Sequence, residues 1–335
     1  MPLRILVISD AWHPQVNGVV VTLGMLAHEL EMLGHVVEII GPDRFRTVAM
    51  PGYRSIKLAF APSRDLVPMI EAFAPQALHI ATEGPLGWAA RRWALRTGTK
   101  FTTSFHTRFP EYLHARARVP PLLSYAFLRG FHNRSQGTMV ATGSMRRELA
   151  ARGFSNLLPW SRGVDLHGFR PGEREAWPWP RPIFLYVGRL AIEKSVARFL
   201  SLDLPGTKVV VGDGPERAAL ERAFPEARFV GERHGAALRR AYAGADVFVF
   251  PSVTDTFGLV LLESLACGTP IAALPVTGPA DILANAGPGV GALDMDLRAA
   301  ALRALGGNRA ACRLHAERFS WRACAELFCR NLATS

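Results

Sequence analysis

The sequence predicts an α/β protein made of two domains in tandem, each built on an open parallel sheet. Three observations lead to this prediction. Apolar runs of strand length alternate with amphipathic stretches of helical length in both halves, a stretch rich in proline and charge separates the halves, and polar residues follow the strands. The 335 residues suffice for two cores of ordinary size, and 49% hydrophobic and 20% charged residues are typical of a globular protein.

In the first half, the alternation starts with an apolar, β-branched run from Leu3 to Ser9, which has the length of a buried parallel strand. Leucines at helical spacing follow up to a glycine stop at Gly34, and 36–40 is the next predicted strand. A strand, a helix and a strand in this order form a βαβ unit. The pattern continues with strands at 78–82, 100–105 and 137–142, and with helices that begin near 85 and 144.

A change in composition marks the boundary between the domains. The segment 170–181, RPGEREAWPWPR, is rich in proline and charge and cannot hold a core element. We therefore predict an N-terminal domain over 1–168, a linker over 169–181 and a C-terminal domain over 182–319, with a last amphipathic helix over 320–335 that packs back on the first domain. In the second domain, we predict strands at 183–188, 207–212, 227–231, 247–250 and from 270, and helices at 194–202, 215–224, 236–243 and from about 257.

The N-terminus and the cysteines limit the class of protein. No stretch approaches 18 apolar residues and the first apolar run is too short for a signal peptide, so we expect a cytoplasmic protein. The four cysteines form no CxxC pair, so we expect reduced thiols and no metal site.

The net charge of +11 is concentrated in one window, which contributes +8. Such a concentration indicates an anionic partner: a membrane surface, a nucleic acid or an anionic substrate. Within this window, 115–134 mixes arginine with Leu, Tyr and Phe, as in segments that lie on an anionic bilayer. The alternative is a cationic surface helix whose apolar face packs into the core. No nucleic-acid-binding module is recognised, so we expect no nucleic acid partner. The window contains one acid, Glu111, and nine basic residues: Arg91, Arg92, Arg96, Lys100, Arg108, Arg116, Arg118, Arg129 and Arg134.

The stretch 245–273, ADVFVFPSVTDTFGLVLLESLACGTPIAA, carries the principal candidate site. Asp255 lies in the turn between a strand and a helix that opens near 257, and Glu263 follows about two helical turns later, roughly 10–12 Å along the axis. Free backbone N–H groups over 256–259 suit a phosphate. The layout fits an elongated ligand with a diphosphate between two hydroxyl-rich groups. The alternative is that Asp255 is only an N-cap and Glu263 only a solvated helix residue.

Four further stretches that follow strands contain candidate residues. Arg189 and Lys194, in GRLAIEKS, follow a strand and could neutralise a diphosphate, although a solvated loop is the alternative. The glycines of VGDGPE at 211–216 fit a tight turn and close backbone approach better than a phosphate loop. Gly18, in PQVNGV, would let a ligand approach the start of a helix. His106 follows a strand, where a structural role is the alternative to a catalytic one.

Taken together, these stretches resemble the family-4 retaining glycosyltransferases of the GT-B fold over nearly the whole chain. The likeness rests on PxxNGV, TEGPLG, FHTRFPEYL, RGVDLHGF, VGRLAIEK, VGDGPE, ADVFVFPS and TDTFGLVLLESLACGTPI. It implies two Rossmann-like domains that face each other across a cleft. The family signature is two acids with seven residues between them, usually both Glu. Here it is Asp255 and Glu263, a departure seen in glycolipid-synthesising branches, and Ser195 departs from the usual Gly or Asn.

The resemblance also implies a role for each candidate residue. Glu263 would hold the nucleotide ribose and Asp255 the transferred sugar. Arg189 and Lys194 would hold the diphosphate, and His106 would line the sugar site. The remaining donor contacts would come from Gly18, Phe257, Gly258 and Leu259.

We therefore expect a retaining transferase that needs neither metal nor cofactor and moves a hexose from a nucleotide-diphosphate sugar to an acceptor alcohol. The basic window favours a membrane lipid such as diacylglycerol as the acceptor, and a peripheral association with the inner face of the cell membrane. The alternatives are a transferase of polysaccharide or lipopolysaccharide assembly and a GT-B epimerase or phosphorylase.

Overall fold

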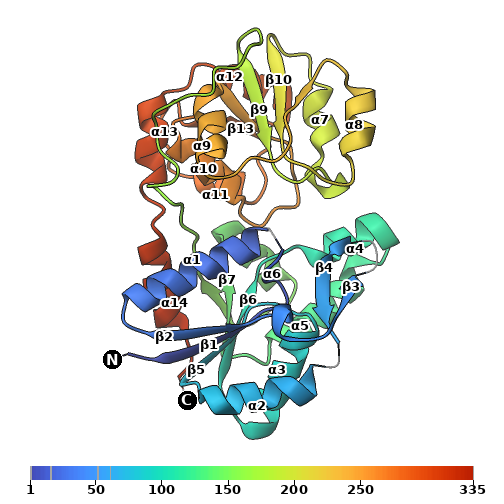
Figure 1. Cartoon of the computed structure of the whole chain (residues 1–335), viewed down its shortest axis with the longest axis vertical. Coiled ribbons are helices and arrows are strands. Elements are labelled where there is room, and N and C mark those ends of the chain that lie inside the picture. The colour runs from blue at the N-terminus through green and yellow to red at the C-terminus, as the bar shows by residue number, and fades with distance from the viewer. Residues whose placement is uncertain (1, 16, 51–52, 61, 335) are drawn as a thin grey trace. The chain divides into compact units, whose positions relative to one another are not determined.

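The computed structural model describes residues 2–15, 17–50, 53–60 and 62–334, without the side chains of 50, 53–56 and 115–117. The described chain forms two compact units (Figure 1). The first contains the residues up to Arg162 together with those from Trp321 onward, and the second is Gly163–Ser320. Each unit is an α/β structure built on a parallel sheet, which confirms the predicted fold class. Among the described residues, no helix is both long and apolar enough to cross a bilayer.

The first unit is built on a six-stranded sheet with the order β2-β1-β5-β6-β7-β8, in which all pairs are parallel. Because the order reverses at β1, the carboxyl ends of β1 and β5 form the topological switch point, where open α/β sheets bind ligands. The strands are β1 Arg4–Ile8, β2 Val36–Ile40, β5 Ala77–Ile80, β6 Phe101–Phe105, β7 Gly137–Val140 and β8 Leu157–Pro159.

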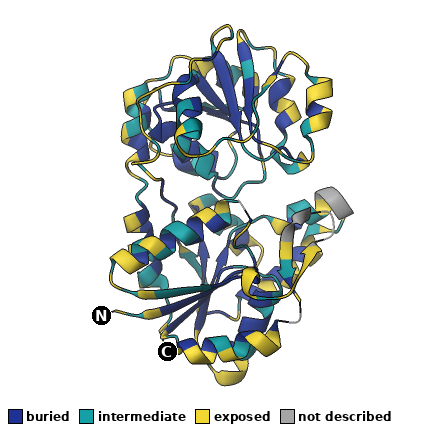
Figure 2. Ribbon diagram, in the orientation of Figure 1, coloured by how far each residue is buried: buried dark blue, intermediate teal, exposed yellow. Residues whose placement is uncertain are grey.

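Helices cover this sheet, and its strands are largely buried (Figure 2). The first helix begins where Asn17 accepts hydrogen bonds from the N–H groups of Val19 and Val20, and it buries leucines at helical spacing. The helices are α1 Gly18–Met32, α2 Ser63–Phe73, α3 Pro85–Thr97, α4 Phe109–Ala117, α5 Pro121–His132, α6 Gly143–Ala151 and α14 Trp321–Asn331. A short helix and an antiparallel hairpin, absent from the prediction, are η1 Pro42–Arg44, β3 Thr47–Met50 and β4 Tyr53–Ala59.

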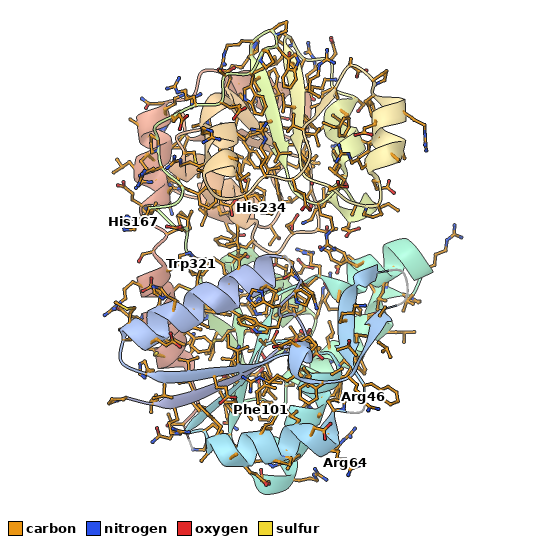
Figure 3. The ribbon with its side chains drawn as sticks, viewed as in Figure 1. Arg46, Arg64, Phe101, His167, His234 and Trp321 are labelled. Carbon is orange, nitrogen blue, oxygen red and sulfur yellow. The ribbon has the colours of Figure 1, made fainter. Side chains whose placement is uncertain are left out.

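Helix α14, which begins at Trp321 (Figure 3), belongs to the first unit. Its thiol at Cys324 donates to the carbonyl of Ser161, and Asn331 Nδ2 donates to the carbonyl of Pro159 at 2.6 Å. Its apolar face includes Phe328, which is fully buried. These contacts attach the end of the chain to the strand β8 edge of the first sheet.

The second unit repeats the architecture with the strand order β11-β10-β9-β12-β13-β14. All its pairs are parallel, and its switch point lies between β9 and β12. The strands are β9 Ile183–Val187, β10 Thr207–Val211, β11 Arg228–Phe229, β12 Val247–Phe250, β13 Ile271–Ala273 and β14 Gly291–Leu293. The helices are η2 Ile192–Lys194, α7 Val196–Leu200, α8 Arg217–Ala223, α9 Gly235–Gly244, α10 Leu259–Ala266, α11 Pro279–Leu283, α12 Leu297–Ala304 and α13 Arg309–Ala316.

The segment 170–181, predicted to be a linker, is bonded along the second unit. The N–H of Glu175 donates to the carbonyl of Arg240 at 3.0 Å, and Arg181 Nη2 donates to Asp246 Oδ1 at 2.7 Å. The chain passes from the first unit to the second after Arg162, and the segment 170–181 belongs to the second unit.

The glycines of VGDGPE allow two loops to touch through their backbones. A Cβ at Gly212 would lie 2.0 Å from the carbonyl oxygen of Gly188, and one at Gly214 would lie 2.3 Å from that of Leu190. Both glycines have a positive φ, at 141° and 157°. The interpretation of these glycines as close-approach residues is confirmed.

We expect Gly212→Ala to lower the free energy of unfolding of the second unit by more than about 2 kcal/mol, because the new Cβ has no space and the φ angle disfavours alanine. Gly24→Ala is the matched control. Gly24 lies inside α1, and an added Cβ would meet no atom within 4 Å, so the change should stabilise by roughly 0.5–1 kcal/mol. Urea unfolding of both variants tests this, and equal effects would contradict it.

Candidate active site

Two loops at the switch point of the second sheet carry the charged residues that the sequence singled out. The β9 loop, residues 188–195, carries Arg189 and Lys194, and the β12 loop, residues 251–258, carries Asp255. Since β9 and β12 are neighbours in a parallel sheet, their carboxyl ends place both loops at the same edge.

Hydrogen bonds and one ion pair join the two loops. Thr254 Oγ1 donates to the carbonyl of Glu193 at 3.0 Å, and Ser252 Oγ approaches the same oxygen at 3.5 Å. Lys194 Nζ donates to Asp255 Oδ1 at 2.5 Å, and both side chains are largely buried. Arg189 and Lys194 are therefore not part of a solvated loop: the structure holds the segment that carries them against the β12 loop.

The second carboxylate oxygen of Asp255 is buried. Among the described residues, Asp255 Oδ2 has no hydrogen-bond partner. Leaving a buried acceptor unpaired costs about 1–3 kcal/mol, so this oxygen is suited to accept a hydrogen bond from a bound hydroxyl.

The alternative that Asp255 is only an N-cap is wrong. Helix α10 begins at Leu259, and its N-cap position is taken by Gly258, whose φ of 90° is left-handed. The helix therefore begins later than predicted, and its first N–H groups come from Leu259 onward instead of from 256. The ring of Phe257 is buried edge-on to Phe319, so this residue offers only its backbone to a ligand.

Glu263 is not a solvated helix residue either. Tyr242, which is fully buried in α9, donates its hydroxyl to Glu263 Oε2 at 2.9 Å. Burial raises the pKa of the Glu263 carboxyl to about 7, and the Tyr242 hydrogen bond opposes this rise. Tyr242 was not identified from the sequence because its contact with α10 depends on the packing of two helices.

Ser195 lies at a strained position next to Lys194. The predicted helix over 194–202 is divided: η2 ends at Lys194, Ser195 has a φ of 53°, and α7 starts at Val196. Glycine and asparagine adopt this left-handed conformation most readily, so a serine is an unusual residue at this position.

Arg189 is fixed through its backbone. The hydroxyl of Tyr186 donates to the carbonyl of Arg189 at 3.0 Å. The arginine side chain is half-buried, and it forms no ion pair with any other described residue. A partly desolvated guanidinium without a counterion is suited to bind an anion.

In the first unit, Gly18 is the first residue of α1, but the following N–H groups are already used. Those of Val19 and Val20 donate to Asn17 Oδ1 at 2.9 and 3.1 Å. The N–H groups of Val19 and Val20 are therefore engaged within the protein and are not open to an anion.

Both ring nitrogens of His106 are hydrogen-bonded within the first unit. Arg162 Nη2 donates to His106 Nδ1 at 3.2 Å, and because arginine can only donate, the ring proton lies on Nε2 and is directed at Ser104 Oγ, 2.9 Å away. Burial, with the charge of Arg162, holds the pKa of His106 well below its ordinary value. His106 is therefore a neutral, oriented ring. Arg162 was not singled out from the sequence, although it opens the RGVDLHGF motif.

Helix α5 exposes apolar side chains beyond its core face. Tyr125, Leu128 and Phe131 are buried, whereas Leu122 and Phe127 are 79% and 58% exposed. Some cations of the basic window form hydrogen bonds or ion pairs within the first unit. The side chain of Arg116 lies outside the described residues. The exposed cations are Arg92, Arg96, Lys100, Arg118, Arg129 and Arg134.

The raised pKa of Glu263 predicts a pH-dependent stability. Because the folded state binds its proton more tightly than the unfolded state, the free energy of unfolding should fall as pH rises from about 4.5 to about 7. Glu263→Gln should remove this component and be more stable than the parent near pH 8. Urea unfolding at acid and alkaline pH measures it, with exposed Glu226→Gln as control. The same pH dependence in parent and Glu263→Gln would contradict the burial effect.

Comparison with known proteins identifies the family. The model of Glycosyltransferase Family 4 matches residues 16–167, and that of Glycosyl transferases group 1 matches 181–306. A GDP-mannose-dependent alpha-mannosyltransferase of Mycolicibacterium smegmatis is 32% identical over 323 residues, which cover 88% of this chain and 85% of the relative. A GDP-mannose-dependent alpha-(1-6)-phosphatidylinositol dimannoside mannosyltransferase of Mycobacterium tuberculosis is 28% identical over 307 residues, 80% of this chain and 78% of the relative.

A solved structure supports the fold. Sucrose-phosphate synthase from Thermosynechococcus elongatus superposes with a TM-score of 0.73 at 21% identity, covering 97% of each chain. The two parallel-sheet units, their charged switch-point loops and the extent of the family matches lead to one conclusion: the chain belongs to glycosyltransferase family 4 and is a glycosyltransferase of the GT-B fold.

Proposed function

We propose that this glycosyltransferase is a retaining, metal-independent hexosyltransferase that uses a nucleoside-diphosphate sugar and an alcohol of a membrane lipid as acceptor. The observation that carries the proposal is the joined pair of loops in the second unit. They bring two cations and a carboxylate with an unpaired oxygen to one sheet edge, next to the start of α10.

Each part of the proposed donor has its own partner among these groups. Arg189 and Lys194 bind the diphosphate, and the N-terminus of α10 adds its dipole. Asp255 Oδ2 accepts a hydrogen bond from a sugar hydroxyl, and Glu263 accepts from the ribose when it is ionised. Lys194 is shared between Asp255 and the incoming phosphate, so donor binding loosens the ion pair of the free protein.

The cations of the β9 loop stabilise the leaving group. As the bond between the sugar C1 and the phosphate oxygen breaks, negative charge develops on the diphosphate, and Arg189 and Lys194 neutralise it, a task that divalent metals perform in other enzymes. The acceptor oxygen forms its bond to C1 on the same face, and its proton passes to the departing phosphate oxygen. One observation supports a path without a histidine nucleophile: His106 is neutral, with both ring nitrogens engaged in hydrogen bonds.

A lipid acceptor is supported by the surface of the first unit. Leu122, Leu123 and Phe127 project from α5 into solvent, near a chain segment with a strong excess of positive charge. Apolar side chains that enter the interface and cations that meet anionic headgroups together give peripheral binding. The similar mycobacterial protein whose name specifies phosphatidylinositol dimannoside acts on a lipid, in agreement with this proposal.

We expect Lys194→Ala and Glu263→Ala each to lower transfer by about 100-fold or more, because each removes one contact with the charged donor. In the assay, the protein is incubated with a membrane lipid extract and a panel of nucleotide sugars that includes GDP-mannose, and the products are identified by their mass. Arg222→Ala and Glu226→Ala, which change exposed charges of the second unit, should retain activity. Near-normal turnover by either site variant, with an intact fold by circular dichroism, would refute this site.

Membrane binding is tested by liposome sedimentation. Anionic vesicles should bind more protein than neutral ones, and Leu122→Asp with Leu123→Asp should reduce binding by about tenfold, because charge replaces two inserted side chains. Leu314→Asp changes an equally exposed leucine of the second unit and should have no effect. Equal binding to neutral and anionic vesicles would count against a membrane acceptor.

A further inference from the structure

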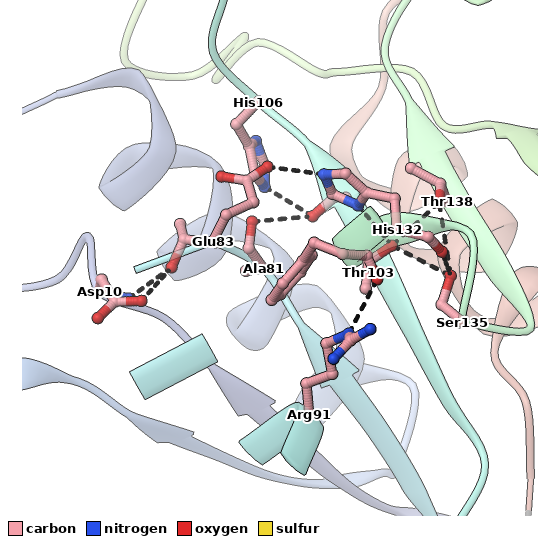
Figure 4. Close-up of polar contacts among 12 residues, drawn as sticks. Asp10, Ala81, Glu83, Arg91, Thr103, His106, His132, Ser135 and Thr138 are labelled. Carbon is pink, nitrogen blue, oxygen red and sulfur yellow. Dashed lines mark hydrogen bonds and ion pairs between the residues drawn. The ribbon is translucent and has the colours of Figure 1, made fainter. Parts of the chain in front are cut away.

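We infer that Glu83 binds the acceptor through hydroxyl groups, and that His132 is a positioning residue that orients the Glu83 carboxylate. The inference rests on the proposed transfer to an alcohol and defines the chemistry of the acceptor: a polyol whose hydroxyls donate to one carboxylate. It is carried by a buried chain of polar side chains that ends at Glu83 (Figure 4).

Glu83 lies at the switch point of the first sheet. It follows β5, which lies between β1 and β6 in the sheet. In the β5 and β6 pairing, Ile80 is opposite Thr103, so Glu83 and His106 each lie three residues beyond a paired position and reach the same carboxyl edge. Ser104 Oγ, the partner of His106, also donates to the carbonyl of Ala81 at 3.4 Å, which links these two strand ends.

The other carboxylate at this edge is already satisfied by the protein. Asp10 Oδ1 accepts from the N–H of Leu86 at 2.8 Å, and Oδ2 accepts from the N–H of Gly87 at 3.2 Å and from Thr82 Oγ1 at 3.0 Å. Asp10 therefore anchors the start of α3 and is buried. Glu83 is near enough to raise the pKa of Asp10, a small contribution beside that of burial.

His132 holds Glu83 from the interior. It is fully buried, its Nε2 lies 2.9 Å from Glu83 Oε1, and its Nδ1 lies 2.9 Å from Thr103 Oγ1. An ionised carboxylate only accepts, so Nε2 carries a proton and donates to Glu83. Behind His132, Thr103 Oγ1 is within 3.2 Å of Ser135 Oγ and 3.1 Å of Thr138 Oγ1.

The order of these side chains is the reverse of that in an acid–base triad. In acid–base triads, the carboxylate is innermost and the histidine faces the ligand. Here the histidine is innermost and the carboxylate, with 21% of its side chain exposed, is the outer group. Oε1 is taken by His132, and Oε2 of Glu83 makes no hydrogen bond to any other described residue. A carboxylate with one fixed and one available oxygen is suited to accept from neighbouring hydroxyls of a polyol.

The test separates acceptor from donor binding. With the donor that the parent enzyme uses, vesicles containing phosphatidylinositol serve as acceptor probe, and KM is measured for donor and acceptor separately. We expect Glu83→Gln to raise the acceptor KM by about tenfold or more and to leave the donor KM within about twofold, because only the carboxylate accepts at both oxygens. His132→Gln should raise the acceptor KM by a smaller factor, and Glu71→Gln, an exposed acid of α2, should change neither constant.

Free myo-inositol and glycerol are the second arm. If myo-inositol or glycerol competes with the vesicles in the parent but not in Glu83→Gln, Glu83 recognises hydroxyls of the free polyol. If neither competes while the acceptor KM still rises in Glu83→Gln, Glu83 recognises the polyol as part of a lipid headgroup. An unchanged acceptor KM in Glu83→Gln, or equal changes in both KM values, would overturn the inference. If Glu83→Gln does not fold, Glu83→Asp takes its place, because it keeps the charge but withdraws it from His132. The same comparison of the acceptor KM with the donor KM then applies. Absence of transfer by the parent protein with every donor would instead refute the proposed function.

Discussion

The ion pair between Lys194 and Asp255 is the interaction on which the site of this protein depends. It joins the loop after β9 to the loop after β12, and these loops meet only because the two strands are neighbours at the switch point of a parallel sheet. Without a ligand, each charge neutralises the other in a largely buried setting, where an isolated charge would be costly. In the proposed donor complex, the diphosphate would offer Lys194 a second anion and so release the constraint on Asp255.

Burial sets the pKa or the orientation of the other polar groups at the two sheet edges. Burial beside Tyr242 raises the pKa of Glu263 to about 7, so its charge changes in the physiological range. His106 is kept neutral by burial and by Arg162, whose hydrogen bond fixes the ring in one tautomer. Glu83 keeps an outward oxygen while His132 holds the inward one. Each unit thus presents oriented polar groups at the carboxyl edge of its own sheet.

The alternation of elements was sufficient to predict the strands of both sheets except the edge strands β8 and β14, because parallel strands that are buried on both faces appear as short apolar runs. The sequence also indicated Arg189, Lys194, Asp255 and Glu263, since charged residues directly after strands are visible as a pattern. It could not show that α10 starts at Leu259, because that depends on the left-handed conformation of Gly258. Tyr242 and His132 were missed for a related reason: their partners come from other helices or strand ends, and only packing brings them together.

Calorimetric titration of GDP and of UDP into the chain in the presence of EDTA tests the central claim, that side chains of the second unit bind the diphosphate without a metal. We expect binding in EDTA that weakens by about tenfold or more in Arg189→Ala and is unchanged in Arg222→Ala, because only Arg189 belongs to the switch-point loop. Binding that requires a divalent cation, or that is equal in the parent and in Arg189→Ala, would contradict it.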